Sequence, residues 1–336
     1  MLCLALGACV ARAVAGLPAG GEEIEPPAPR GLLATRTQNP MFLQFFRFRP
    51  VGAPPPAAGR GSLELTSEYT SYFRIDGETF DHFAALDGEV WRNVLRGRLG
   101  LGRSVALTIE VPALYAGGGF LDRYIEDYHD LFGFNQEGRD RNPDNRYLFA
   151  LVADGTTAYD LPQNDLGLGD VSLVVDWQLR PGSAGAPGVV LRAGVELPTG
   201  DEARGFGNGR TDGGLGVAVS QRLGIRHLHA DVGYQLQGQP RSFTAAGVDV
   251  RDNWSADLGV ERALGARTTL IAQLGFEESP IRDLRLPAVD DNSATLAVGV
   301  DVRLAGRWAL DAYFLEDLDG ESTQDFTASV GLRFDW

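Results

Sequence analysis

The chain alternates apolar and polar residues over many separate stretches. The clearest stretch covers residues 326–336, whose apolar positions are Phe326, Ala328, Val330, Leu332, Phe334 and Trp336. Because successive side chains of a strand point to opposite faces, this spacing predicts a strand with one apolar and one polar face. The same period predicts further strands, which begin near Leu63, Trp91, Val105, Val171, Val189, Leu215, Leu228, Trp254, Thr268, Ala294 and Trp308.

The lengths of these strands and of their connections indicate a membrane barrel. Most strands are near the ~9 to 11 residues that a tilted strand needs to cross a bilayer, whereas strands of soluble proteins average about five or six. Short turns, such as those around Gly224, Gly265 and Gly306, alternate with long excursions. Outer-membrane barrels alternate short periplasmic turns with long external loops in this way. We therefore predict an all-β fold, an antiparallel transmembrane up-and-down barrel of twelve strands with both chain ends in the periplasm.

One segment leaves the strand count open. Residues 146–152 and 157–160 flank Asp154-Gly155, which is typical of a β-hairpin turn. Two spanning strands here would raise the count to fourteen. The arms are short and their surroundings resemble loops, so we predict an external hairpin.

The two faces of the strands differ in chemistry. The polar face carries small residues and opposed charges, which suit a crowded lumen: Asp170, Asp176, Glu196, Asp231, Asp257, Glu261, Asp301, Arg303, Asp311 and Arg333. Aromatic residues near strand ends indicate an interfacial girdle, although aromatics also favour strands in general: Trp91, Tyr115, Trp254, Trp308 and Trp336. We therefore expect the apolar face to contact lipid.

The N-terminal region predicts export. Residues 1–15 form an apolar stretch that ends in a small-x-small cleavage pattern, and the missing basic start suggests a truncated start codon. A lipoprotein site at Cys9 is the alternative. Residues 16–60 are rich in Pro, Ala and Gly and predict a periplasmic linker, with the barrel at 61–336. Within the linker, the aromatics of residues 37–48 need burial, which a fold back into or under the barrel would supply.

Composition excludes some functions. The chain has 336 residues and a formal net charge of −15. This lacks the basic excess that neutralises phosphates, so no nucleic acid is expected as a partner. The expected partners are outer-membrane lipid, the barrel-assembly machinery acting on the strand that ends at Trp336, and a small solute. The expected location is the outer membrane of a Gram-negative bacterium.

Several short motifs also suggest a family. They are Gln38-Asn39-Pro40, residues 118–122, 125–126 and 129–133, Gly167-Leu-Gly-Asp170, residues 197–201 and Thr211-Asp212. Together they make the chain resemble the bacterial family catalogued as domain of unknown function 3187, over about residues 35–336. That resemblance implies an outer-membrane barrel. Some elements are also similar to those of barrel transporters linked to aromatic-compound catabolism, and neither group supplies a catalytic residue.

The most distinctive candidate element lies in the longest external loop. Residues 120–132 place apolar side chains at helical spacing, with Glu126, His129 and Asp130 on the opposite face. This amphipathic helix could act as a lid or ligand gate, or as a structural cap with a solvated acidic face. A metal site would need further ligands, and we predict neither a metal nor a cofactor.

The remaining candidates lie on the strands. Arg92, Arg96 and Arg98 could select anions or pair with Glu110 on the next strand. Further lumen candidates are Asp170, Glu196, His227 and His229.

A His and an Asp near a lumen serine could form a hydrolase dyad or triad, but no motif singles out a nucleophile, so we predict no enzyme. The predicted function is a passive channel or uptake protein for a small solute, with an apolar solute as one option. The alternatives are a membrane-embedded lipid hydrolase and a plugged structural barrel.

Overall fold

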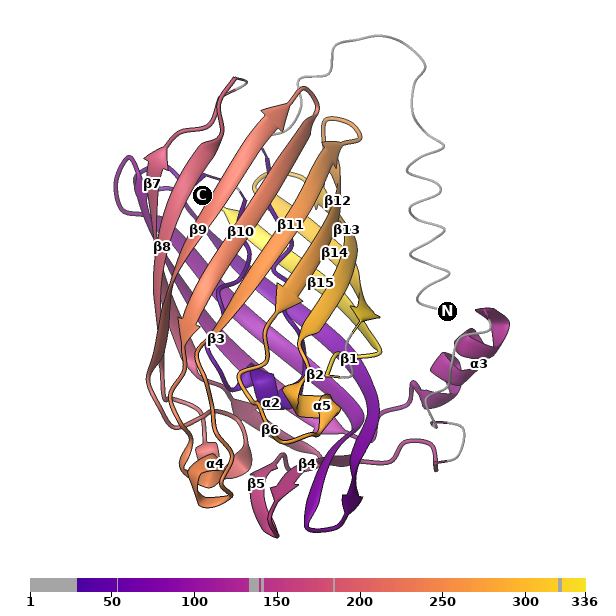
Figure 1. Ribbon diagram of the computed structural model, residues 1–336. Coiled ribbons are helices and arrows are strands. Elements are labelled where there is room, and N and C mark those ends of the chain that lie inside the picture. The colour runs from indigo at the N-terminus through magenta and orange to yellow at the C-terminus, as the bar shows by residue number, and fades with distance from the viewer. Residues whose placement is uncertain (1–28, 53, 133–138, 140–141, 184, 320–321) are drawn as a thin grey trace.

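Twelve antiparallel strands close into a barrel in the computed structural model, which describes residues 29–52, 54–132, 139, 142–183, 185–319 and 322–336 (Figure 1). The strands follow one another around the barrel in chain order: β1 (Gly61–Thr79), β2 (His82–Gly100), β3 (Val105–Gly117), β7 (Val171–Arg180), β8 (Gly188–Leu197), β9 (Asp212–Leu223), β10 (Arg226–Leu236), β11 (Asn253–Ala263), β12 (Thr268–Glu277), β13 (Ser293–Arg303), β14 (Trp308–Asp319) and β15 (Phe326–Asp335). The predicted fold class and strand count are confirmed. The predicted start of the second strand near Trp91 is wrong, because β1 and β2 continue as a hairpin beyond the ring and β2 begins at His82.

The C-terminal strand closes the barrel. β15 pairs with β14 on one side and with β1 on the other. At the end of the β1 pairing, the Trp336 amide donates to the Gly61 carbonyl at 3.0 Å. The wall of the barrel is therefore continuous, and no strand edge of the ring is left open to lipid.

Three further strands lie outside the ring. β4 (Leu148–Ala153) and β5 (Thr156–Asp160) form a hairpin on the outer part of β2, and β6 (Asp165–Leu168) pairs with β3. Asp154 and Gly155 have φ values of 47° and 73°, as a tight hairpin turn requires. The predicted external hairpin is thus confirmed.

The outer surface of the ring is apolar. Side chains that a soluble protein would bury are exposed here, as with Leu215 at 69% exposure. Others are Leu63, Leu65, Leu95, Ile109, Val175, Leu228, Leu258, Leu274, Val298 and Leu332. Such a belt is the surface that a transmembrane barrel presents to lipid. Among the described residues, no helix is both long enough and apolar enough to cross a membrane.

Exposed aromatic residues lie towards both ends of the belt. Trp254 is the second residue of β11, and its ring stacks on Phe276 at 4.6 Å. At the opposite end of the barrel, Trp308 packs against Phe334 at 5.0 Å, and Trp336 follows the last strand. These positions agree with the predicted girdle.

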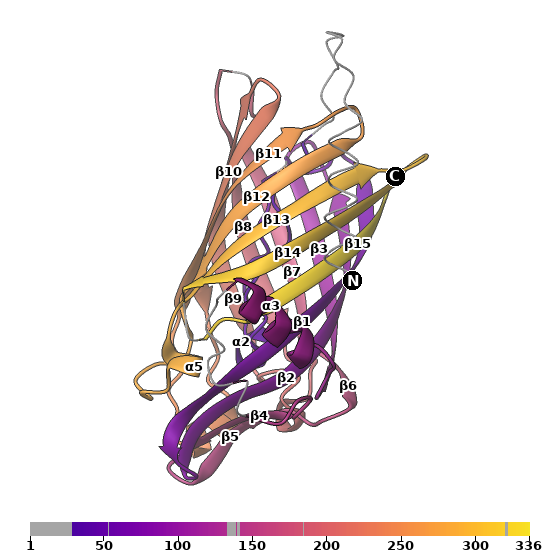
Figure 2. The ribbon, with the colours of Figure 1, turned by 90° about the vertical axis from the view of Figure 1, so that its right-hand side faces the viewer.

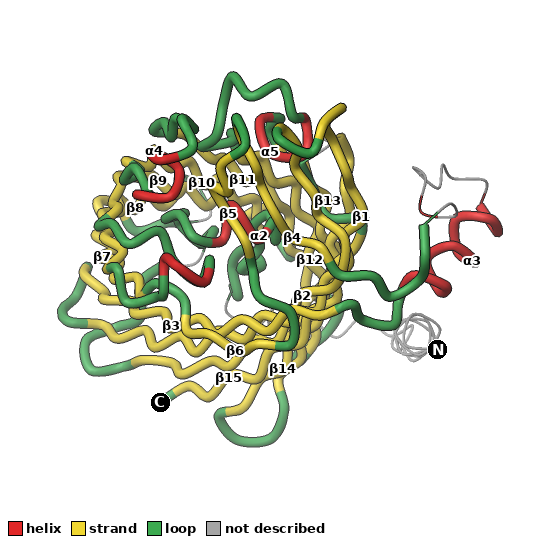
Figure 3. Tube along the Cα trace, turned by 90° about the horizontal axis from the view of Figure 1, so that it is seen from below, coloured by secondary structure: helices red, strands yellow, loops and turns green. Residues whose placement is uncertain are grey.

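Short helices gather at the end of the barrel opposite to the C-terminus (Figure 1). They are α2 (Pro40–Leu43), α4 (Arg241–Ala245), α5 (Pro287–Asp290) and the 3-10 helix η2 (Glu202–Arg204). The long connections lie at this end, so we call it the external end. α3 (Asp122–Phe132) projects from the side of the barrel, outside its wall (Figures 2 and 3). The loop helix that the sequence predicts is present.

Residues 30–52 lie inside the barrel. Figure 3 shows α2 within the ring of strands. The predicted division into residues 1–15, 16–60 and 61–336 stays a prediction, because the expected export signal, with its two cysteines, lies outside the described residues.

Candidate functional site

The candidate site is the lumen, which is occupied by residues 30–52, here called the lumen segment. Residues 31–42 and 44–50 are all buried, although α2 is the segment's one regular element. The segment runs from the end of the barrel near the C-terminus towards the external end, turns at α2, and returns to reach β1. It therefore forms two limbs, residues 30–39 and 44–52, that cross the barrel interior.

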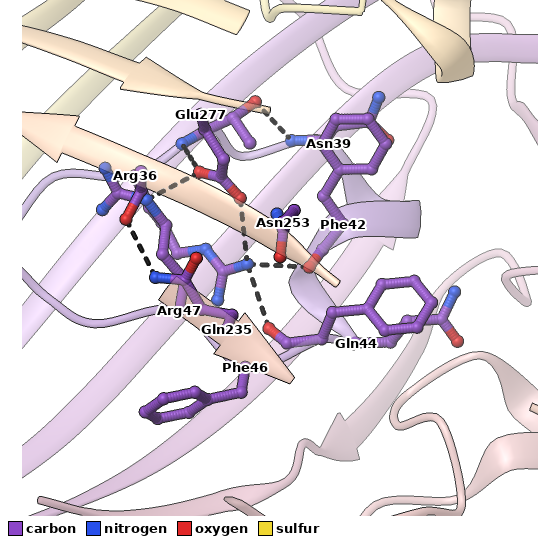
Figure 4. A network of polar contacts seen from close by, with 12 residues as sticks. Arg36, Asn39, Phe42, Gln44, Phe46, Arg47, Gln235, Asn253 and Glu277 are labelled. Carbon is purple, nitrogen blue, oxygen red and sulfur yellow. Dashed lines mark hydrogen bonds and ion pairs between the residues drawn. The ribbon is translucent and has the colours of Figure 1, made fainter. Parts of the chain in front are cut away.

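Arginine side chains tie the two limbs to each other. Arg36 Nη2 donates to the carbonyl of Phe42 at 2.7 Å (Figure 4) and to that of Phe45 at 3.2 Å. Arg47 Nη1 donates to the Thr35 carbonyl at 2.8 Å. Arg49 Nη1 donates to the Ala34 carbonyl at 2.6 Å. Guanidinium groups thus donate to buried carbonyls of a segment that belongs to no sheet.

The same arginines bind the segment to the wall. Arg47 lies 3.0 Å from an Asp257 oxygen and 2.8 Å from Glu277. Arg30 lies 3.1 Å from Asp311 and 3.4 Å from Asp301. These side chains are at least nine-tenths buried, and removing one partner of such a pair leaves an uncompensated charge at a cost of about 3–5 kcal/mol. The contact between segment and wall therefore depends on charge.

Arg36 and Arg49 complete this set of contacts. Arg36 lies 3.7 Å from Glu277. Arg49 lies 3.7 Å from Glu68 and 3.6 Å from Glu110, on the opposite part of the wall.

Glycines on the lumen face give the segment its space. A Cβ on Gly194 would lie 2.4 Å from the Phe46 ring, and one on Gly233 would lie 2.7 Å from the Phe48 ring. A Cβ on Gly259 would lie 2.3 Å from Leu32. The small residues that the sequence places on the polar face thus accommodate large apolar side chains of the segment.

The turn of the segment is held by the external loops. Asn39 caps α2 through Met41 and donates to the carbonyls of Ala288 at 3.1 Å and Ser322 at 2.9 Å. Met41, Phe42 and Phe45 join a buried apolar cluster at this end, with Tyr72, Leu86, Phe149, Tyr159, Phe206, Phe243 and Ile281 among its members. The outer end of the lumen is therefore closed by both polar and apolar contacts.

Other motif residues organise the same loops. Asp170 accepts from the amides of Gly200 at 2.7 Å and Asn208 at 3.1 Å. Burial raises the pKa of the Asp170 carboxyl, although backbone hydrogen bonds act in the opposite direction. Asp212 accepts from the Phe46 amide at 3.2 Å and so links the loops to the segment.

Three predicted arginines of β2 have different partners. Arg96 Nε donates to Glu110 at 2.6 Å, as expected. Arg92 instead donates to Glu68 at 2.7 Å, and Arg98 to Asp176 at 3.0 Å. The prediction that all three pair with Glu110 is wrong, because their register places Arg92 opposite Glu68 and Arg98 opposite Thr108.

Glu196 and the histidines lie in separate parts of the lumen. Glu196 accepts from the Ser172 hydroxyl at 2.7 Å. His229 Nδ1 lies 2.9 Å from Ser220 Oγ, and its Nε2 lies 3.4 Å from Glu261. His227 lies 3.6 Å from the same carboxylate. A Ser-His-Glu arrangement is therefore present, which the sequence did not identify.

This arrangement holds both ends of the segment. Ser220 donates to the Gly52 carbonyl. Glu261 accepts from the Gly31 amide at 2.7 Å and from the Arg30 amide at 3.2 Å. The His229 side chain is fully buried, and a Cβ on Gly52 would lie 2.3 Å from its ring. The group therefore acts as a clamp on the backbone of the segment.

The predicted gate residues lie apart from the lumen. Glu126 and Asp130 belong to α3, outside the barrel wall. The His129 side chain lies outside the described part of the structure. A gating role for the three residues stays a prediction. Within the described residues, no group of three or more His, Cys, Asp or Glu side chains is arranged to hold a metal ion.

A cavity remains beside the segment near the periplasmic end. It measures about 300 Å³, and its lining includes Arg30, Pro50, Glu64, Arg96, Arg98 and Arg333. The segment thus fills the lumen incompletely at this end.

The main residues that sequence reasoning missed are the segment's arginines. The aromatics at 37–48 did signal a need for burial, but the arginines between them resemble those of any solvated linker.

Comparisons with known proteins agree with this architecture. The family model described as "Protein of unknown function (DUF3187)" matches residues 25–336. The chain belongs to this family. No curated protein matches the sequence. The DUF3187 match confirms the resemblance inferred from the motifs.

Solved structures share the fold of this DUF3187 chain. The COG4313 outer membrane channel from Pseudomonas putida F1 superposes with a TM-score of 0.58 at 14% identity, covering 86% of this chain and 100% of that one. A KdgM porin in complex with disordered oligogalacturonate gives a TM-score of 0.43 at 8% identity, covering 82% of this chain and 99% of that one. The P. putida toluene transporter TodX gives a TM-score of 0.39 at 9% identity, covering 89% of this chain and 93% of that one. The first comparison shows a common fold, and the other two carry no argument.

Proposed function

We propose that this protein is an outer-membrane channel of a Gram-negative bacterium that takes up a small solute, and that the lumen segment closes it. The apolar belt and the fold shared with an outer membrane channel support the location. One observation carries the channel function. Many of the wall residues that face the segment are charged or polar, as Asp231, Asp257 and Gln273 are, so departure of the segment would leave a wettable passage.

The connection to β1 favours a movable segment. Residues 54–56 are three consecutive prolines between the segment and the first strand. Prolines supply no backbone donor, so they cannot join the adjacent ladder. The segment is thus tethered to the wall by its C-terminal side without being part of the sheet.

Two alternatives compete with the channel. A lipid hydrolase would need Ser220 free to attack a substrate, whereas Ser220 donates to Gly52 and the His229 ring is covered by the segment. A plugged structural barrel is favoured by the number of buried ion pairs. Conductance separates the channel from the permanent plug.

The first test records purified full-length protein in planar bilayers. We expect brief openings separated by long closed intervals, and a larger open fraction in Arg47→Gln. Removing Arg47 leaves Asp257 and Glu277 without this ion-pair partner in the closed state. If the closed state is destabilised by about 3 kcal/mol, the equilibrium between closed and open states changes roughly a hundredfold.

The matched control is Arg251→Gln, which removes an exposed ion pair with Asp283 in the external loops. It should leave the open fraction unchanged. Absence of conductance in the wild-type and Arg47→Gln proteins would favour the structural barrel.

A further inference from the structure

The two halves of the lumen wall differ in charge balance. On β1, β2, β3, β7 and β8, buried or half-buried arginines meet carboxylates of the same wall: Arg92, Arg96, Arg98 and Arg192 face Glu64, Glu68, Glu110 and Asp176. This half therefore supplies buried or half-buried arginines of its own, although it also carries the buried carboxylates Asp87, Glu89 and Glu196.

The other half carries an excess of carboxylates. Strands β10 to β14 contribute six buried ones, here called the acidic wall: Asp231, Asp257, Glu261, Glu277, Asp301 and Asp311. The arginines on these strands are Arg226, Arg262 and Arg303, and all three are exposed. Arg192 and Arg333 reach across from neighbouring strands to Asp231 and Asp301. The acidic wall therefore has fewer cations of its own than carboxylates.

The lumen segment supplies the missing cations. Within the described part of the chain, Asp257, Glu277 and Asp311 form ion pairs with Arg30, Arg36 and Arg47 of the segment. Asp257 Oδ2 and Glu277 lie within 3.0 Å of Arg47. Oδ2 of Asp301 and of Asp311 are buried and accept no hydrogen bond. The guanidinium groups of the segment thus show that this wall binds cationic groups.

We propose that the open lumen selects small cations, and that the segment's arginines occupy the cation path in the closed state. This inference rests on the proposed channel function and names its solute class. When the segment leaves, Asp257, Glu277 and Asp311 lose their ion-pair partners inside a narrow polar passage. In channels, ion selectivity is set by rings and rows of side chains that carry the same charge, because they concentrate counter-ions and repel co-ions.

The test measures the reversal potential of the full-length protein under a KCl gradient. We expect K⁺ to be about tenfold more permeant than Cl⁻, the lower end of the counter-ion enrichment that such clefts produce. Equal permeability, or a preference for Cl⁻, in wild-type openings overturns the proposal.

Two sets of variants separate charge selection from gating. Arg47→Gln removes the contacts of Arg47 with Asp257 and Glu277. The triple variant Asp257→Asn/Glu277→Gln/Asp311→Asn weakens the same contacts and also those of Arg30 with Asp311 and of Arg36 with Glu277. Both should therefore open more often, but only the triple variant should lose the preference for K⁺. A triple variant that keeps the wild-type preference contradicts the proposal.

A matched control carries the same change in net charge at exposed positions outside the lumen, Asp81→Asn/Asp144→Asn/Asp249→Asn. It should keep the wild-type permeability ratio. If the triple lumen variant fails to fold, the permeability ratios of K⁺ to Cl⁻ in the wild-type and Arg47→Gln proteins alone decide whether the proposal holds. A protein that never conducts refutes the channel and this inference, whereas conductance without K⁺ preference refutes the inference only.

Discussion

At the scale of single residues, the lumen is built from pairs of small and large side chains. Gly194 on β8 and Gly233 on β10 leave room for Phe46 and Phe48, whose rings lie 4.9 Å apart. Both glycines lie in strand interiors, where glycine is normally unfavourable. Their cost is offset by the close approach of the lumen segment to the wall.

Replacing Gly194 with alanine should displace the segment. The new Cβ would lie 2.4 Å from the Phe46 ring, and overpacking of this kind costs about 1–3 kcal/mol. We expect a higher open fraction in planar bilayers and a lower melting temperature. Gly265→Ala, in a turn where a Cβ meets nothing within 4 Å, is the control. Equal behaviour of the two variants would show that the segment does not depend on this space.

Individual contacts of the lumen could be predicted only in part. The alternating pattern placed Asp231, Asp257 and Asp301 on the lumen face correctly. Their partners could not be inferred, because Arg47 and Asp257 are 210 positions apart and no local pattern links them. Pairing across adjacent strands was predictable only where the register was known, as for Arg96 and Glu110.

At the scale of elements, long strands were predictable and short helices were not. β12, for example, shows its period over ten residues and was placed correctly from Thr268. α2 and α5 have four residues each, too few for a helical period. Helices this short depend on tertiary contacts such as those of Asn39. Their positions were therefore beyond sequence analysis.

The aromatic side chain at the end of the terminal strand allows a test of how the barrel is assembled. The Trp336 ring is 37% exposed and stacks near Phe334 at 6.4 Å, while the main chain of Trp336 already closes the barrel on Gly61. We propose that the ring is read by the barrel-assembly machinery. Trp336→Ala should lower the amount of heat-modifiable barrel in cells but leave refolding in detergent unchanged.

A matched variant tests whether the position of the aromatic residue matters. Trp177→Ala removes another outward-facing indole, which is 52% exposed on β7, away from the chain end. It should assemble normally. If Trp336→Ala refolds as poorly in detergent as it assembles in cells, the ring contributes to stability and not to recognition.

At the scale of the whole molecule, the chain combines an apolar outer belt with a charged interior that its own N-terminal region fills. The sequence predicted the barrel, because the strand period recurs in twelve segments and most connections alternate between short and long. It indicated that residues 37–48 are buried in or under the barrel but did not decide between these two places, since a proline-rich stretch has no periodic pattern. The segment's four arginines then pair with wall carboxylates on both sides of the lumen.

The most direct test of this account fixes the segment to the wall. Thr35 Oγ1 accepts from Gln273 Nε2 at 2.7 Å, so cysteines at these two positions would face each other. In a background with Cys3 and Cys9 replaced by serine, a short reducible thiol cross-linker should join Thr35→Cys to Gln273→Cys. Thr70→Cys/Thr327→Cys, whose native hydroxyls lie 2.8 Å apart on β1 and β15, links two wall strands as the control.

The measurement is single-channel conductance before cross-linking, after it, and after reduction. We predict that the Thr35–Gln273 link abolishes openings, that reduction restores them, and that the control link has no effect. Openings that persist at the wild-type frequency with the segment fixed would contradict the claim that it closes the channel.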